Sequence, residues 1–210
     1  MTILHRFSSK DTTKSTSKPQ IIEQEYIPQD TSIPTTLLFN FNGALQRNIT
    51  VTTLDKSTTL YTINVRCTRK PNLTFTANGT TVGTSTFHTM KPIDLTIANQ
   101  TLQLKTASRM SCRKFTYASP ALNGAEVTWQ VNGKGVLKFP DLVALDDQAM
   151  PLGKFVFGHW VKTAGTMEIA EGTEKREMGR ALVDELVVVG FTLAELQMQV
   201  YSAAVAGATA

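Results

Sequence analysis

The stretch RALVDELVVVGFTLAELQMQVYSAA, residues 180–204, decides the fold, because its apolar residues cover almost every side of a helix. A narrow polar stripe interrupts them, formed by Asp184, Thr192, Glu195 and Gln199, with Glu185 beside its start. A helix that is apolar nearly all round is buried, either in a membrane or in a protein core. The rest of the chain must therefore supply whatever surrounds it.

A protein core fits this stretch better than a membrane does. Twenty helical residues span about 30 Å, which would match the hydrocarbon core of a bilayer. However, Asp184, Glu185 and Glu195 lie within that length, and each would cost roughly 2.5–3.5 kcal/mol near the bilayer centre. We therefore expect a core helix at about 180–203 and no transmembrane span, with a tail-anchored membrane helix as the alternative.

The chain ahead of this helix consists of short runs with period-two hydrophobicity, separated by turn residues every eight to twelve positions or so. Asn78-Gly79 and Asn99-Gln100 are the predicted two-residue hairpin turns. The runs expected to form strands are residues 36–41, 48–54, 58–66, 72–77, 80–88, 93–98, 101–105, 113–118, 126–131, 135–139, 142–146, 154–161 and 166–170. Such a series indicates an antiparallel sheet, closed into a barrel or folded into a sandwich.

The strands and the helix together predict one architecture. A barrel of about twelve strands is too wide to be filled by its own side chains, and the terminal helix is long enough to fill it. We predict an all-β fold with one helix: an antiparallel barrel of about twelve strands that encloses the hydrophobic C-terminal helix. The predicted domain covers residues 36–203, between a flexible Ser/Thr/Lys-rich tail at 1–35 and a flexible tail at 204–210.

Catalytic and metal-binding patterns are sparse. His88 and His159 fall on predicted strands, where a structural role is the simpler interpretation, and neither belongs to a zinc-ligand motif. Cys67 and Cys112 lie beside basic residues, and we interpret them as half-buried strand cysteines whose pairing stays open. Asp184 and Glu185 are predicted to cap the start of the helix, where the macrodipole favours negative charge. We expect neither an enzyme nor a cofactor.

The distribution of charge is the main functional signal. The chain has a net charge of +4, but residues 36–114 carry ten basic and only two acidic side chains. The densest clusters lie at predicted strand ends and would share one rim of a barrel; they are Arg66, Arg69, Lys70, Arg109, Arg113 and Lys114. Such a patch predicts an anionic partner, although charges that merely face water would give the same sequence pattern. Nucleic acid is the weaker candidate, because aromatic content is only 8% and no strand interleaves aromatic with basic residues.

Four segments carry a resemblance to a known family. They are TVGTSTFHTMKPIDLTIAN (81–99), GAEVTWQV (124–131), GTMEIAEG (165–172) and LVDELVVVGFTLAEL (182–196). In this order the chain, over residues 36–200, resembles the tubby C-terminal fold, whose relatives include LURP-one-related proteins and phospholipid scramblases, and is most similar to uncharacterised fungal tubby-like domains. The resemblance implies a twelve-stranded barrel around a helix and the binding of phosphoinositide headgroups. The Cys-rich and calcium-binding segments of the scramblases have no counterpart here, so scrambling is not expected.

These observations predict an intracellular binding domain, because the first residues, MTILHRFSSKD, do not form a secretory leader. The expected location is cytoplasmic with peripheral membrane association. The predicted partner is anionic phospholipid, with phosphoinositide as a candidate headgroup, bound through the basic residues at the barrel rim. The alternatives are a scaffold that recognises an acidic protein and a barrel that carries an apolar ligand beside its helix.

Overall fold

The computed structural model describes residues 36–42, 48–89, 91–106, 113–132, 139–158, 163–170, 173 and 179–208. Within these residues, strands precede a single long helix. The elements are β1 (Thr36–Asn42), β2 (Asn48–Thr53), β3 (Thr59–Val65), β4 (Leu73–Ala77), β5 (Thr80–Thr86), β6 (Ile93–Ile97), β7 (Gln100–Thr106), β8 (Lys114–Ala118), the 3-10 helix η1 (Pro120–Leu122), β9 (Glu126–Asn132), β10 (Asp141–Leu145), β11 (Pro151–Phe157), β12 (Thr163–Ile169) and α1 (Gly179–Ala208).

The twelve strands form a closed antiparallel barrel in which every strand pairs with its neighbours in the sequence. Closure comes from β1, which pairs with β12 through a register that begins at Thr36 opposite Glu168. The predicted all-β barrel with one C-terminal helix is therefore confirmed. Of the strand expected at 135–139, residues 135–138 lie outside the described residues and Phe139 is not in a strand.

Two-residue turns close the β4–β5 and β6–β7 hairpins. Asn78 and Gly79 have φ angles of 49° and 78°, and Ala98 and Asn99 have φ angles of 47° and 63°. Positive φ at both positions is the geometry of the type I′ turn, whose twist matches that of paired strands. The second turn lies one residue earlier than the predicted Asn99-Gln100, because Ile97 pairs with Gln100 and leaves Ala98 inside the turn.

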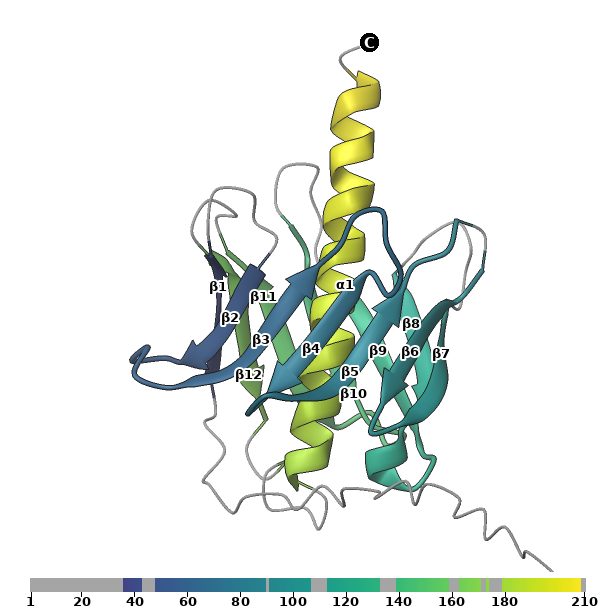
Figure 1. The fold of residues 1–210 in the computed structure, drawn as a ribbon. Helices are drawn as coiled ribbons and strands as arrows, with labels where there is room; N and C mark the ends of the chain where they lie inside the picture. Colours follow the sequence, from purple (N-terminus) through teal and green to yellow (C-terminus); the bar gives the residue numbers. More distant parts are fainter. Residues whose placement is uncertain are drawn as a thin grey trace, which may run out of the picture.

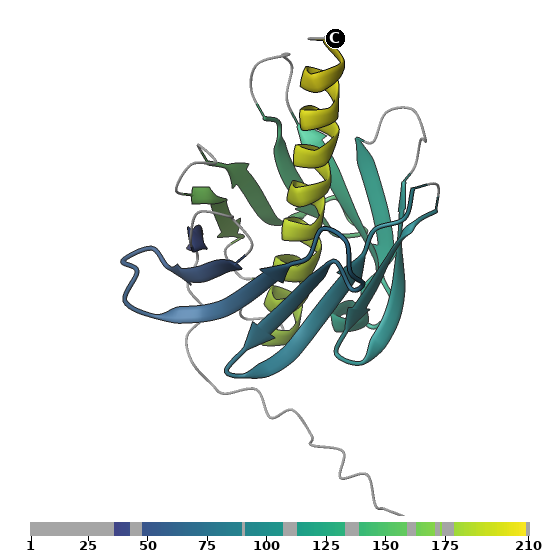
Figure 2. The same cartoon turned by 45° about the horizontal axis from the view of Figure 1, so that its top comes forward.

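The helix α1 runs through the middle of the barrel and fills it (Figures 1 and 2). Every residue from Leu182 to Ala194 is buried. Inward-facing strand residues surround this segment; Leu37 and Phe39 of β1 and Leu73 and Phe75 of β4, for example, are fully buried. The predicted core helix is thus confirmed, and in the described part of the chain no helix is long and apolar enough to cross a membrane.

The helix is longer than the sequence suggested. It continues to Ala208, five residues past the predicted end at 203. Residues 209–210 and the expected tail at 1–35 lie outside the described residues. The extension follows from composition, because residues 202–208 contain four alanines and no proline.

Because neighbouring strands run in opposite directions, successive connections alternate between the two ends of the barrel. The β3–β4 and β5–β6 connections, the end of β7 and the start of β8 lie at the end where α1 projects, which we call the upper end (Figure 1). The β2–β3, β4–β5, β6–β7 and β10–β11 turns lie at the opposite, lower end, as does η1, which connects β8 to β9. Residues far apart in the sequence therefore share the upper end.

Candidate anion-binding site

Basic side chains gather at the upper end of the barrel, on the connections and strand ends just described. We call this set the basic rim; its described members are Arg66, Arg69, Lys70, Lys91, Lys105, Arg113 and Lys114. All seven residues are exposed. Of the six residues predicted from the sequence, five are in this set, and Arg109 lies outside the described residues.

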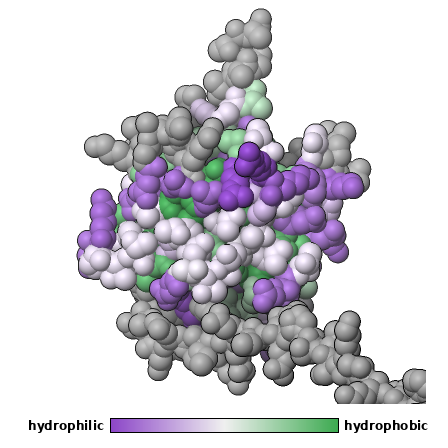
Figure 3. All heavy atoms as spheres, in the orientation of Figure 1, coloured by the Kyte–Doolittle hydropathy of each residue, from purple (hydrophilic) through white to green (hydrophobic). Residues whose placement is uncertain are grey.

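The basic rim has little negative charge to balance it. Among the described residues from β3 to β8, Asp94 of β6 is the only carboxylate. No ion pair joins a rim cation to a carboxylate within the described part of the chain. Figure 3 shows hydrophilic residues gathered across the upper part of the face that β3 to β6 form. The surface thus presents uncompensated positive charge, which attracts anions.

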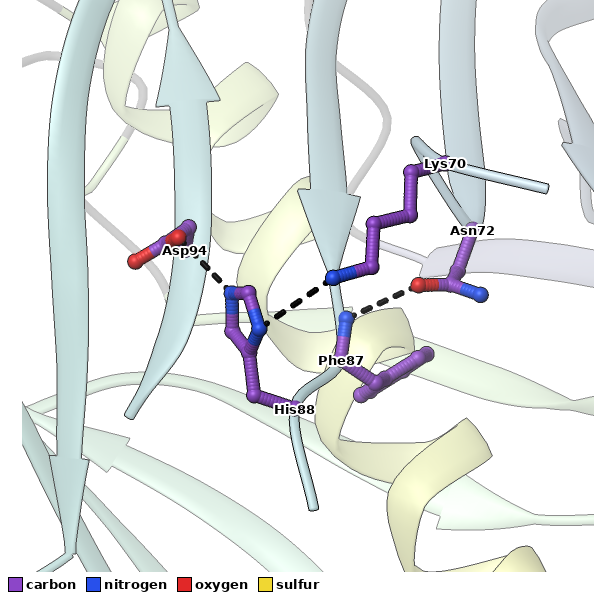
Figure 4. Close-up of polar contacts among 5 residues, drawn as sticks. All are labelled: Lys70, Asn72, Phe87, His88 and Asp94. Carbon is purple, nitrogen blue, oxygen red and sulfur yellow. Dashed lines mark hydrogen bonds and ion pairs between the residues drawn. The ribbon is translucent and has the colours of Figure 1, made fainter. Parts of the chain in front are cut away.

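A histidine connects two of the rim connections (Figure 4). His88, just after β5, places Nε2 2.8 Å from Oδ2 of Asp94, and Nδ1 lies 3.4 Å from Nζ of Lys70. An ammonium group can only donate, so in this arrangement Nδ1 accepts from Lys70 and Nε2–H donates to Asp94. The Lys70 ammonium is held near the Asp94 side of the rim without pairing with that carboxylate.

Asn72 fixes the backbone of the same region. Its side-chain Oδ1 accepts the backbone N–H of Phe87 at 2.9 Å, and its Nδ2 donates to the carbonyl of Arg66 at 3.2 Å. The backbone N–H of Arg66 donates to the carbonyl of Asn72 at 2.7 Å. The β3–β4 connection is therefore held against the residue that follows β5, which positions Arg66 and Lys70.

A second polar cluster lies inside the barrel, near its lower end, and the sequence prediction for it was wrong. Asp184 and Glu185 do not cap α1, because the first turn of the helix contains no acidic residue. Asp184 Oδ1 instead accepts from the Tyr61 hydroxyl at 2.5 Å and from Arg180 Nε at 3.1 Å. A carboxylate buried in a core needs such donors, because leaving its oxygens unpaired would cost several kcal/mol or so.

The carboxylate of Glu185 accepts hydrogen bonds from another part of the barrel, the β8–η1 segment. Its Oε1 accepts from the Tyr117 hydroxyl at 2.8 Å, and its Oε2 accepts from the backbone N–H of Ala121 at 3.2 Å. Burial raises the pKa of the Glu185 carboxyl, and burial next to that carboxyl raises the pKa of Tyr117 well above its usual range. Both carboxyl groups are enclosed, with Asp184 5% and Glu185 1% exposed. The cluster ties the helix to the barrel and offers no open surface to a ligand.

The described residues contain no group of three or more His, Cys, Asp or Glu side chains arranged to hold a metal ion. Cys67 is exposed and follows the end of β3, so the prediction of a half-buried strand cysteine is wrong for it. Cys112 and His159 lie outside the described residues.

Sequence reasoning missed two members of the rim, Lys91 and Lys105. Both carry a detectable signal, because every second hairpin connection of an up-and-down barrel lies at the same end. Comparisons of this chain with protein-family models, with curated proteins and with solved structures find no match. The geometry of the chain itself must therefore carry the functional argument.

Proposed function

We propose that this protein is a non-enzymatic, tubby-like barrel that docks on anionic phospholipid through its basic rim. The observation that carries the proposal is the gathering of seven exposed cations at one end of the barrel, with a single carboxylate among them. The twelve-stranded barrel around a C-terminal helix supports the resemblance to tubby-like domains. In this proposal the protein is intracellular and associates peripherally with membranes.

The size of the rim suits reversible attachment. A cation near an anionic membrane surface contributes about 1 kcal/mol, so seven would contribute about 7 kcal/mol. That free energy corresponds to a dissociation constant on the order of 10 μM. Binding of this strength depends on salt, because the Debye length shortens as ionic strength rises.

Lipid fits the rim better than nucleic acid does. Proteins that bind single strands stack bases on exposed aromatic side chains. Throughout the residues that the structure describes, every phenylalanine, tyrosine and tryptophan is buried or half-buried. The rim offers charge without a stacking platform, which favours phosphate groups displayed on a surface.

Co-sedimentation with vesicles tests the proposal. Neutral phosphatidylcholine vesicles are compared with vesicles that also contain phosphatidylserine or a phosphoinositide, at about 0.05 and 0.3 M salt. We expect binding to the anionic vesicles only, weaker at the higher salt concentration. Phosphoinositide vesicles that bind more protein than phosphatidylserine vesicles of equal charge would identify the headgroup.

The double variant Arg113→Glu/Lys114→Glu supplies the control for charge. Both side chains are exposed, so we expect the variant to lose vesicle binding with a melting temperature close to that of the wild type. Absence of wild-type binding to every anionic vesicle would contradict the proposal. Capture of an acidic protein that the same variant loses would then identify the alternative, a scaffold with an acidic partner.

A further inference from the structure

The central helix leaves the barrel at the end that carries the basic rim, and aromatic contacts fix its exit. The ring centroids of Tyr201 and Phe139 are 4.6 Å apart, and Phe139 stacks on Phe157 of β11 at 5.1 Å. These contacts hold α1 against the barrel at Tyr201. The end of the helix then projects from the upper end, as both ribbon views show (Figures 1 and 2). We call residues 200–208 the helix tip.

The helix tip has a composition unlike that of the rim around it. No charged side chain occurs in the sequence from residue 196 to residue 208. Val200 is 48% exposed, and Ala203 and Ala204 are exposed as well. The last acidic residue of α1 is Glu195, which is half-buried and whose carboxyl pKa is raised by burial. The tip therefore brings no acidic side chain toward an anionic surface.

Exposed apolar side chains are otherwise found at the opposite end. Among the described residues, the exposed large hydrophobic side chains are Leu54, Met150 and Val200. Leu54 and Met150 lie in the β2–β3 and β10–β11 connections at the lower end, whereas Val200 lies on α1 toward the end that projects. The upper end is thus the one that combines an exposed apolar helix segment with an excess of cations.

The length of the tip matches a shallow insertion. The part of the tip beyond the Tyr201 contact, residues 202–208, extends about 10 Å along the helix axis at 1.5 Å per residue. Interfacial helices bury their apolar surface about 5–10 Å into the boundary between headgroups and acyl chains, whereas a crossing needs about 30 Å. The rim cations, which lie from the end of β3 to the start of β8, would contact phosphates at the depth where such a tip enters. An acidic protein would match the cations but not an uncharged helix that stands out from them.

We propose that the helix tip inserts into the interface of an anionic bilayer while the basic rim contacts the surrounding headgroups. This proposal rests on the proposed function and adds an orientation, with the upper end of the barrel facing the membrane. It makes α1 both the core of the fold and the inserting element.

A matched pair of substitutions tests the role of the tip. Val200→Asp and Leu54→Asp each replace an exposed large hydrophobic residue by a carboxylate, at opposite ends of the barrel. We expect Val200→Asp to weaken binding to phosphatidylserine vesicles about tenfold and Leu54→Asp to change it by less than about twofold. Equal effects of the two substitutions would overturn the proposal.

A depth measurement separates insertion from docking by charge alone. In a Cys67→Ser/Cys112→Ser background, an environment-sensitive dye is attached at Ala203→Cys or, as the control, at Leu54→Cys. With lipids that carry a quencher just below the headgroups, we expect quenching of the Ala203 label and none of the Leu54 label. Vesicle-bound protein whose Ala203 label stays unquenched would overturn insertion and leave rim docking intact. No binding of the wild type to any anionic vesicle would overturn both proposals.

Discussion

Replacing Phe191 by alanine would empty the centre of the barrel. The Phe191 ring is fully buried and stacks on Phe39 of β1, with centroids 5.6 Å apart and planes 2° apart. It also packs edge-to-face on Phe75 of β4 at 6.3 Å and on Phe155 of β11 at 6.4 Å. The substitution therefore removes contacts with three strands at once, and a closed sheet cannot collapse freely into the space.

The expected loss follows from these contacts. Phenylalanine-to-alanine changes in cores cost about 3–5 kcal/mol, and limited collapse places this site at roughly 4 kcal/mol. For a chain of this size each kcal/mol lowers the melting temperature by about 2–4 °C, so we expect a decrease of roughly 8–16 °C. Phe191→Leu retains most of the volume and should cost less than about 1.5 kcal/mol.

Urea unfolding followed by circular dichroism, together with a thermal melt, measures both quantities. Val200→Ala, in the exposed part of the same helix, is the control and should change the free energy of unfolding by less than about 0.5 kcal/mol. If Phe191→Ala cost less than about 1 kcal/mol, the helix could not be the core that the barrel is built around.

Three further substitutions test other contacts of α1. A Cβ at Gly190 would lie 2.8 Å from Cη2 of Trp129, so Gly190→Val should lower the free energy of unfolding by about 1–3 kcal/mol in urea titrations. Tyr61→Phe removes a donor to buried Asp184 and should lower the melting temperature through a loss of about 1–3 kcal/mol. Burial raises the pKa of Glu185, so the folded state binds its proton more tightly, and this contribution to stability is lost as the pH rises from about 4.5 through the raised pKa. Glu185→Gln should therefore make the free energy of unfolding fall less steeply as the pH rises over this range. An unchanged dependence of the free energy of unfolding on pH would contradict the raised pKa of Glu185.

The barrel and its central helix could be predicted because both depend on local patterns. Residues 182–194 are apolar nearly all round, so they must be buried by the rest of the chain. The period-two strands with tight turns indicate an antiparallel sheet that can enclose them. The end of the helix was harder to predict, because its last turns have no packing partner that the sequence displays. Alanine-rich sequence without a breaker continued the helix to Ala208.

The basic rim was partly predictable for a topological reason. Clusters at 66–70 and 109–114 were dense enough to notice, and their common end follows from strand parity. Lys91 and Lys105 are isolated in the sequence and join the set because the barrel places the β5–β6 connection and the end of β7 between those clusters. Assigning each predicted connection to one end of the barrel, instead of looking only for dense clusters of charge, would have identified both lysines.

The buried carboxylates could not be assigned from the sequence. Tyr61 lies 123 positions from Asp184, and Tyr117 lies 68 positions from Glu185, so only the closed barrel brings each donor to its acceptor. The sequence still carried a signal, because two acidic residues on a helix that is apolar nearly all round require hydrogen-bond donors, and two tyrosines lie on inward faces of strands. The helix-capping interpretation was wrong because it took account of the helix alone and not of the strand tyrosines that surround it.

The most direct test of rim docking compares one charge reversal at each end of the barrel. Lys114 belongs to the basic rim and Lys56 lies in the β2–β3 turn at the lower end; both are exposed, and each reversal to glutamate lowers the net charge equally. On phosphatidylserine vesicles we expect Lys114→Glu to bind about tenfold more weakly than the wild type and Lys56→Glu to bind within about twofold of it. Equal weakening by the two variants would show that net charge, and not the basic rim, governs binding, and would contradict the account.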